Sequence, residues 1–224
     1  MSPPGEVEQI RALADQVARP SGEAGLRVAE NMNAANARLA ERAIAALDVQ
    51  PGQQVGEVGP GNGQLSAALV QRLGKSGRYT AIELAPDMAR ECQARLAGLG
   101  AAKVQVLNVD CRLAELPAAS VDGIFGTNFV YFLDELESFL SRAANWLKPG
   151  GRLVIGIRSK ASMSRLPFTP YGFRLRESAE IAAALAGCGF EEIRDQYFDD
   201  EGEHRIGDLT VRVDAHIISA RKPF

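Results

Sequence analysis

The segment Val55-Gly56-Glu57-Val58-Gly59-Pro60-Gly61-Asn62-Gly63 carries glycine at three alternate positions, after a β-prone run and before a helix-prone one. Glycine adopts positive φ without strain and leaves no Cβ between the backbone and a ligand. A helix that begins near Gln64 or Leu65 would present free N–H groups and a positive dipole end to that ligand. The segment therefore predicts a strand, a tight turn and a helix, with an anionic or polar group bound at the turn.

Outward from this turn, β-prone and helix-prone runs alternate along the chain. The expected strands are residues 54–58, 79–84, 104–109, 123–127 and 152–157. The expected helices are residues 65–73, 86–97 and 136–146, the last of which ends before Lys148-Pro149-Gly150-Gly151. Strands that alternate with helices form parallel sheets through right-handed crossovers. The pattern therefore predicts an α/β, doubly wound, Rossmann-like fold with helices on both faces of the sheet.

The pattern changes after residue 157. A helix is expected at residues 177–186, and two β-prone runs follow at residues 190–198 and 210–220. The acidic, glycine-containing stretch 199–208 leaves no room for a crossover helix, so the two runs are expected to pair as an antiparallel hairpin. The complete expectation is a seven-stranded sheet, mostly parallel, with a C-terminal antiparallel hairpin.

The N-terminal residues are expected to cover this core. A short helix over residues 7–17 should stop at Pro20, and residues 21–25 should form a loop. Asn33 is expected to cap a second helix, because its side chain can accept from a free N–H group of the first turn. The apolar stripe of that helix is Leu39, Ala40, Ala43, Ile44 and Leu47.

The length of 224 residues fits a single α/β core. We expect one domain over residues 1–224, with residues 1–36 as an N-terminal cap segment and residues 37–224 as the core. Nothing in the sequence predicts an oligomeric state.

The composition restricts the class of protein. A net charge of −3 and a pI near 5.6 argue against a general nucleic-acid binder. No apolar run approaches the roughly 20 residues of a membrane span, and no basic stretch precedes an apolar one at the N-terminus, so we expect no membrane partner and a cytoplasmic location. Three cysteines without a CxxC pair predict neither a metal site nor disulfides; they are Cys92, Cys111 and Cys188.

The glycine-rich turn fits two ligand classes, or a tight turn without a ligand. A dinucleotide site requires Gly-x-Gly-x-x-Gly, but the last place is Gln64 counted from Gly59 and Ser66 counted from Gly61. Alternate glycines preceded by an acid resemble instead motif I of class I S-adenosylmethionine-dependent methyltransferases. The resemblance covers about residues 30–160 by motif and the remainder by the order of elements.

Two further stretches resemble the UbiE-like, or type 11, branch of these methyltransferases. They are residues 113–122 and Trp146-Leu147-Lys148-Pro149-Gly150-Gly151. The chain departs from the family at Gly56, where a large apolar residue is usual. The resemblance implies S-adenosylmethionine as cofactor, S-adenosylhomocysteine as product and a small-molecule substrate.

The resemblance also gives roles to acids at the strand ends. Glu83 ends the second strand and is implied to accept from both hydroxyls of a ribose, with Leu84 beside it. Asp110 follows the third strand and is implied to accept from the adenine amino group, with Cys111 lying along the ring. In the alternative interpretation these acids only cap a helix or a turn.

Residues around the first and fourth strands complete the implied cofactor site. Glu57 is implied to order the glycine loop and to meet the methionine ammonium, and a buried carboxylate there must be paired. Asn128 and Phe129 are implied to lie near the reactive methyl group, although Phe129 and Phe132 also fit an apolar core. The expected cofactor-binding residues are Glu57, Gly59, Gly61, Gly63, Glu83, Leu84, Asp110, Cys111, Asn128 and Phe129.

The chemistry implied is methyl transfer by in-line displacement. A sulfonium methyl group is already electrophilic, so the chain must mainly align the acceptor and exclude water. No general base is evident, and no catalytic residue is assigned. His204 falls in the hairpin loop and His216 in the last strand, while Tyr131 and Tyr171 are candidate substrate contacts.

The acceptor pocket is expected from segments without a family signal, namely residues 20–36, residues 162–173 and the hairpin tip. Met32 and Asn36 are expected to close over the ligand. An apolar wall would favour a hydrophobic or aromatic acceptor; its candidates are Met163, Leu166, Phe168, Tyr171 and Phe173. These side chains equally fit a role in pinning a long loop.

Three other functions can be compared with the sequence. A non-catalytic S-adenosylmethionine-binding protein fits, since no base is evident. An NAD(P)-dependent reductase would be expected to carry a Tyr-x-x-x-Lys pair, and an aminopropyl transferase a further Asp-rich pattern; neither occurs here.

Overall fold

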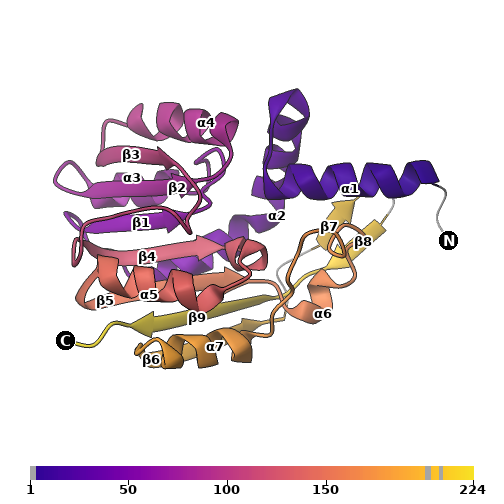
Figure 1. The fold of residues 1–224 in the computed structure, drawn as a ribbon. Helices are drawn as coiled ribbons and strands as arrows, with labels where there is room; N and C mark the ends of the chain where they lie inside the picture. The colour runs from indigo at the N-terminus through magenta and orange to yellow at the C-terminus, as the bar shows by residue number, and fades with distance from the viewer. Residues whose placement is uncertain (1–3, 200–202, 207–208) are drawn as a thin grey trace.

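The computed structural model describes residues 4–199, 203–206 and 209–224 and shows a central sheet covered by helices (Figure 1). Seven strands form this sheet in the order β3-β2-β1-β4-β5-β9-β6. Their bounds are β1 Gln54–Val58, β2 Arg78–Glu83, β3 Lys103–Asn108, β4 Val121–Thr127, β5 Leu147–Ile157, β6 Glu191–Phe198 and β9 Ala215–Arg221. A separate two-stranded sheet consists of β7 Glu203–Ile206 and β8 Leu209–Arg212.

Strand pairing confirms the predicted mixed sheet. β1 pairs in parallel with β2 and β4, β2 with β3, and β4 with β5. β9 is antiparallel to both β5 and β6, so β6 and β9 form the expected C-terminal hairpin. The strand order reverses beside β1, and the carboxyl ends of the parallel strands meet at one edge. This is the position at which open α/β sheets bind their ligands.

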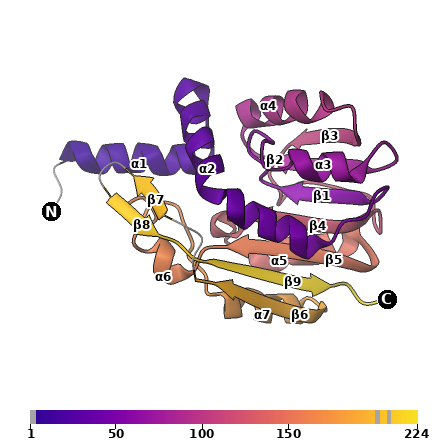
Figure 2. The same ribbon diagram turned by 180° about the vertical axis from the view of Figure 1, so that it is seen from behind.

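Helices cover both faces, as predicted. Their bounds are α1 Pro4–Ala18, α2 Gly22–Leu47, α3 Ala67–Leu73, α4 Pro86–Ala97, α5 Leu136–Trp146, α6 Lys160–Met163 and α7 Ser178–Gly187, with a 3₁₀ turn η1 at Phe129–Phe132. Figure 1 shows α5 and α7 in front of the sheet, and Figure 2, from behind, shows α2 and α3 on the other face. No helix in the described part of the chain is long and apolar enough to cross a membrane.

Two apolar cores follow from the alternation of side chains along the strands. Val55 of β1 packs with the α2, α3 and α4 side of the sheet, whereas Val58 packs with the α5 and α7 side. On the second side, Phe139 and Trp146 of α5 meet edge to face, with ring centroids 6.3 Å apart. The two layers explain why β1 is buried on both faces, from Val55 to Val58.

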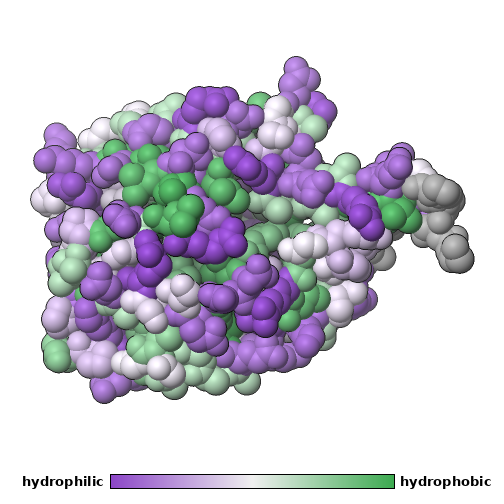
Figure 3. Space-filling model, viewed as in Figure 1, coloured by the Kyte–Doolittle hydropathy of each residue, from purple (hydrophilic) through white to green (hydrophobic). Residues whose placement is uncertain are grey.

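The connection between β3 and β4 differs from the other crossovers of the parallel sheet. No helix separates β3 from β4 in the described chain, and the connecting segment lies over the sheet. A Cβ built on Gly56 would make ordinary van der Waals contacts with Ile124 Cγ1 at 3.5 Å and Leu116 Cδ1 at 4.0 Å, so the space there does not require glycine. Leu113 in the connecting segment is 72% exposed, and Figure 3 shows apolar side chains reaching the surface of the β1–β3 half of the sheet.

The expectation for the N-terminal helices was wrong in one respect. Residues 21–25 do not form a loop, and the second helix does not begin after Asn33; α2 begins at Gly22 and runs unbroken through residue 36. The backbone N–H of Gly22 donates to Asp87 Oδ2 at 2.8 Å, which anchors the start of α2 to α4. Good helix formers between the two early glycines and Asn33 outweigh the breaking tendency of glycine.

The expectation for the last strand was also wrong in detail. The single strand expected over residues 210–220 is divided into β8 and β9 around Asp214. The carboxylate of Asp214 accepts from the backbone N–H of Ser159 at 2.9 Å and from its hydroxyl at 2.6 Å, which draws this corner toward the end of β5. The connection expected at residues 199–208 contains β7, and its residues 200–202 and 207–208 lie outside the described residues.

The other boundaries agree within three residues, except the start of β5, which lies five residues earlier than expected. Residues 148–151 therefore belong to β5 and do not form a separate turn between α5 and β5. The register between β4 and β5 shifts there.

Candidate functional site

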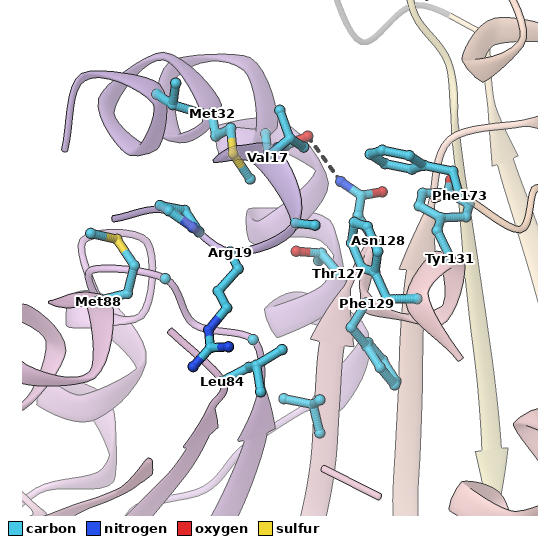
Figure 4. A pocket seen from close by; sticks show the side chains of 18 of the residues that line it. Val17, Arg19, Met32, Leu84, Met88, Thr127, Asn128, Phe129, Tyr131 and Phe173 are labelled. Carbon is cyan, nitrogen blue, oxygen red and sulfur yellow. Dashed lines mark hydrogen bonds between the residues drawn. The ribbon is translucent and has the colours of Figure 1, made fainter. Parts of the chain in front are cut away.

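A cavity of about 780 Å³ lies at the carboxyl ends of β1–β4. Its walls come from α1, the α1–α2 junction, α2, the strand tips, η1 and the segment that follows β5 (Figure 4). Of the residues expected to bind the cofactor, eight line it: Gly59, Gly61, Glu83, Leu84, Asp110, Cys111, Asn128 and Phe129. The cavity thus brings together residues that are up to 70 positions apart in the chain, from Gly59 to Phe129.

The three glycines of the turn have different surroundings. Gly59, Gly61 and Gly63 all have positive φ, at 69°, 58° and 75°. A Cβ on Gly61 would meet nothing within 4 Å, and one on Gly59 only Phe129 Cβ at 3.8 Å, so both positions leave space for a ligand. A Cβ on Gly63 would lie 3.0 Å from Cys92 Sγ, which shows that Gly63 serves close packing against α4 and does not face the cavity.

Glu83 connects the glycine-rich turn to β2. Its carboxylate accepts from the backbone N–H of Gly61 at 3.0 Å and from that of Ala85 at 2.8 Å. Only 6% of the residue is exposed, and this burial raises the pKa of the carboxyl above its ordinary value. Glu83 therefore shapes the turn and still lines the cavity.

Glu57 lies beneath the turn and does not line the cavity. Its carboxylate accepts from the hydroxyl of Ser66 at 2.6 Å and from that of Tyr79 at 2.5 Å. Burial, only partly offset by these two hydrogen bonds, raises the pKa of Glu57 to about 7. The contacts support the implied ordering of the loop, since Ser66 directly precedes α3.

Asp110 and Cys111 follow β3 at the opposite rim. Asp110 accepts from the guanidinium of Arg112, with Nη2 2.6 Å from Oδ2 and Nε 3.0 Å from Oδ1. These hydrogen bonds hold the pKa of Asp110 below its ordinary value. Burial raises the pKa of the Cys111 thiol to about 12, so it is an uncharged lining group.

The tip of β4 carries an unusual residue. Asn128 adopts the left-handed conformation, with φ 59° and ψ 0°, and its backbone N–H donates to the carbonyl of Gly156 at 2.8 Å. Its side-chain Nδ2 donates to Asn36 Oδ1 at 3.1 Å, as the dashed line in Figure 4 shows. Asn128 Oδ1 is buried and has no hydrogen-bond partner among the described residues.

Phe129 belongs both to the cavity and to the apolar core. It lines the cavity, and its ring packs on that of Phe139 with 5.2 Å between the centroids.

Helix α2 contributes polar groups that the sequence did not identify. Asn33 Nδ2 donates to Asn62 Oδ1 at 3.0 Å and to Gln64 Oε1 at 3.2 Å, so it holds the glycine-rich turn and does not cap a helix. Asn33 and Asn36 are three residues apart, which places them on one face of α2. This spacing is the signal that could have indicated their shared role, once α2 is taken as continuous.

The remaining wall of the cavity is mostly apolar, although Arg19 (Figure 4) and Arg158 also line it. It is formed by side chains of α1, η1 and the segment after β5, namely Leu13, Val17, Phe132, Leu133, Met163, Leu166, Phe168 and Phe173. Tyr171 is not among the lining residues and instead packs under the guanidinium of Arg11, 4.9 Å from the ring centroid. Met32 and Asn36, which were expected to close over the ligand, line the α2 side.

Candidate acids and bases contribute little to this wall. Tyr131 lines the cavity, but its hydroxyl donates to the carbonyl of Arg158 at 2.8 Å and accepts from the backbone N–H of that residue at 2.9 Å. His216 bonds to Asp195 at 2.9 Å in the β6–β9 hairpin and does not line the cavity. The side chain of His204 lies outside the described part of the structure. Among the described lining side chains there is no histidine or lysine.

An open α/β sheet with a glycine-rich turn and acidic strand tips defines a nucleoside-binding class of protein. Comparison with known sequences makes this specific, since residues 55–151 match the family described as a methyltransferase domain. Residues 55–151 thus match a methyltransferase domain, and the relatives below support the class I S-adenosylmethionine-dependent type.

Curated relatives share part of the chain. The bifunctional biotin biosynthesis protein BioCD of Bordetella avium is 36% identical over 131 residues, covering 55% of this chain and 25% of that protein. Aklanonic acid methyltransferase DauC of Streptomyces sp. strain C5 is 24% identical, covering 64% and 77%. A protein-L-isoaspartate O-methyltransferase of Ignicoccus hospitalis is 29% identical, covering 62% and 64%. The chain thus spans only a quarter of the first of these relatives and less than two thirds of the third.

Solved structures share the fold over most of the chain. A chain from the complex between the Haloferax volcanii Trm112 methyltransferase activator and a methyltransferase superposes with a TM-score of 0.73 at 18% identity, covering 96% of this chain and 98% of that one. A Haemonchus contortus phosphoethanolamine N-methyltransferase with bound S-adenosylhomocysteine gives 0.64 at 15% identity, covering 82% and 53%. At these identities the likeness concerns the fold.

Proposed function

We propose that this protein transfers a methyl group from S-adenosylmethionine to a small, largely apolar acceptor. The observation that carries the proposal is a single cavity with two different halves. One half has the open turn at Gly59 and Gly61 and the carboxylates of Glu83 and Asp110, and the other is the apolar wall beside α1 and η1. The cavity volume falls within the usual range for small-molecule sites.

The residues present fit the cofactor. The open space over Gly61 would admit a ligand against bare backbone, and Glu83 Oε1 and Oε2 could accept from ribose hydroxyls in addition to their main-chain donors. Asp110 would accept from the adenine amino group, while Leu84 and Cys111 flank the ring. The bound cofactor would supply an electrophilic methyl group, so the chain has to position the acceptor and exclude water.

The apolar wall supports an acceptor of low polarity. DauC and a nocamycin O-methyltransferase of Saccharothrix syringae, which covers 51% of this chain at 29% identity, are named for small-molecule substrates. Other relatives are named for isoaspartyl protein and for phosphoethanolamine. A charged head group would lose hydration against these apolar side chains, so we favour the apolar molecule.

Methyl transfer can be tested with labelled S-adenosylmethionine and a panel of acceptors. The panel would contain uncharged phenols and aromatic alcohols, phosphoethanolamine and an isoaspartyl peptide. We expect label only in the apolar compounds. Label in the peptide or in phosphoethanolamine alone would contradict the acceptor class, and binding of the cofactor without any transfer would favour a non-catalytic role.

A non-catalytic or non-methylating role is the second candidate. The [4+2]-cyclase SpnF shares this fold with a TM-score of 0.65 at 19% identity, covering 84% of this chain and 81% of that one. Its name shows that the fold can serve other chemistry. The absence of histidine and lysine from the described cavity lining is the observation in this chain that keeps the role open.

The proposed setting is the cytoplasm, without a nucleic-acid or membrane partner. The three cysteines are free thiols, which suits a reducing compartment. The net charge of −3 supports a small molecule rather than nucleic acid as the partner.

A further inference from the structure

The corner between α1 and α2 lies beside the loop that follows β2. The backbone N–H of Gly22 donates to Asp87 Oδ2 at 2.8 Å, and Asp87 belongs to the first turn of α4. A buried apolar cluster also joins α2 to this loop, through Ala29, Ala85 and Met88. Because β2 ends at that loop, the corner lies next to the part of the cavity that β2 and β3 form, where the proposed function places the nucleoside.

Hydrogen bonds and close packing fix the shape of this corner. Gln16 Oε1 accepts from the backbone N–H of Ser21 at 2.9 Å, and the carbonyl of Ser21 accepts from the backbone N–H of Gly25 at 2.9 Å. Pro20 is buried, and a Cβ on Gly25 would lie 2.7 Å from its backbone. The protein itself therefore sets the place from which the side chain of residue 19 starts.

Arg19, which directly follows α1, extends a guanidinium from this corner into the cavity. Its backbone N–H donates to the carbonyl of Asp15 at 2.8 Å, which continues the hydrogen bonding of the helix by one residue. Figure 4 shows the side chain directed toward Leu84, which follows β2. Among the described residues the guanidinium has no hydrogen-bond or ion-pair partner, so it is available to a ligand.

The other two arginines of the described cavity lining are held by the protein. Arg112 donates to the carboxylate of Asp110, with Nη2 2.6 Å from Oδ2. The guanidinium of Arg158 donates to two main-chain carbonyls, at 2.8 and 2.9 Å, and the residue is only 2% exposed. Arg19 is exposed, so its side chain can turn when a ligand enters.

A planar cation at this place suits the open face of an adenine ring. Leu84, which is 40% exposed, and Cys111 follow the neighbouring strands β2 and β3, so both approach the ring from the sheet. The face directed toward α1 and α2 is left for Arg19, and a guanidinium stacks well on an aromatic face. The carboxylate of Glu83, at the same strand tip, attracts a cation to this position.

We propose that Arg19 closes the cofactor site by packing its guanidinium on the face of the adenine ring that the sheet leaves open. The inference rests on the proposed function, which places the adenosine at β2 and β3. Arg19 lies outside residues 55–151, which match the methyltransferase family, so the N-terminal helices contribute a cofactor contact of their own. Such a cover slows release of the nucleoside and keeps water out of the cavity.

The test uses two ligands with the same nucleoside. S-adenosylhomocysteine carries the amino acid, whereas 5′-methylthioadenosine has the same adenosine and thioether without it. Both would be titrated by calorimetry into the wild type, Arg19→Ala and Arg19→Lys, since lysine keeps the charge but lacks the planar group. The matched control is Arg27→Ala, because the Arg27 side chain is 70% exposed on α2 and does not line the cavity. None of these substitutions of exposed residues should change the thermal unfolding midpoint of the protein without ligand.

We expect Arg19→Ala to weaken both ligands by the same factor, about fivefold, the scale of a cation packed on an aromatic face. Arg19→Lys should recover only part of this loss, and Arg27→Ala should weaken neither ligand. Unchanged affinities in Arg19→Ala, a loss confined to S-adenosylhomocysteine, or full recovery in Arg19→Lys would overturn the assignment. A wild type that binds neither ligand would overturn the proposed function itself, so the two failures are distinguishable.

Discussion

At the scale of single residues, the two buried glutamates near the turn have separate tasks. Glu83 lines the cavity and accepts from main-chain amides, whereas Glu57 accepts from two hydroxyls below the turn. Both side chains lie on the same face of the sheet, because Glu57 pairs with Ala81, two residues before Glu83. The difference is one of depth, since Glu83 ends its strand at the cavity whereas Glu57 lies farther back, in the layer of Tyr79 and α3. A carboxylate at a strand tip is therefore not by itself a ligand contact.

Removing the strand-tip carboxylates should weaken the cofactor and leave the fold intact. We expect Glu83→Ala and Asp110→Ala each to weaken S-adenosylhomocysteine by about 1–3 kcal/mol, through loss of hydrogen bonds to a charged group. Calorimetry measures the effect, with Glu91→Ala on the exposed side of α4 as control. Unchanged affinity in both variants would place the nucleoside elsewhere.

Adding a side chain to the turn should be more damaging. Gly61→Val places a branched side chain into the ligand space at a φ of 58°, so we expect binding of S-adenosylhomocysteine to be lost. Gly74→Ala is the control for backbone strain, since Gly74 has a φ of 66° and also meets nothing within 4 Å. If Gly61→Val bound as tightly as Gly74→Ala, the turn would not be the binding surface.

The raised pKa of Glu57 predicts a pH-dependent stability. Because its pKa of about 7 in the folded state exceeds the ordinary 4.5, the group favours folding at acid pH, and this contribution is lost as the pH rises through 7. Glu57→Gln lacks the titration, so it should be more stable than the wild type at pH 8.5, by on the order of 3 kcal/mol, and similar to it at pH 4.5. Denaturant unfolding at the two pH values measures this difference. The same difference in free energy of unfolding between wild type and variant at both pH values would contradict the predicted pH dependence.

At the scale of elements, the sequence predicted the regular helices and strands best. The bounds of β1, α4 and α5 agree with the expectation, because their apolar periodicity is complete and glycine or proline marks their ends. The first half of α2 was missed because Gly22 and Gly25 read as loop residues. Gly25 instead allows close approach, since a Cβ there would lie 2.7 Å from the backbone of Pro20.

The contact between α2 and the sheet depends on a small residue in β5. A Cβ on Gly156 would lie 3.1 Å from Thr127 Cγ2 and 3.2 Å from Leu39 Cδ1 of α2. We expect Gly156→Val to destabilise the protein by about 1–3 kcal/mol through overpacking, measured by denaturant unfolding. Gly187→Ala in α7, where a Cβ meets nothing within 4 Å, should have no comparable effect. Equal stability of the two variants would show that α2 is not packed tightly on β5.

At the scale of the whole molecule, the cavity is an assembly of distant segments. The turn and the strand-tip acids could be predicted to share one edge, because parallel strands place their carboxyl ends together. The Asn36–Asn128 bond joins residues 92 positions apart, and the Asn33–Asn62 bond joins residues 29 apart. Neither pair belongs to a periodic pattern, so only the folded chain reveals them. Of the apolar wall, the side chains after β5 were predicted, except that Tyr171 packs outside it. Leu13 and Val17 of α1 and Leu133 after η1 were not predicted.

The most direct measurement of the central claim is a calorimetric titration of the wild-type protein with S-adenosylhomocysteine, run beside NAD. The account predicts one binding site for S-adenosylhomocysteine, an increase in the unfolding midpoint when it is present in excess, and no heat from NAD. Binding of NAD in its place, or binding of neither compound, would contradict the assignment of the cavity.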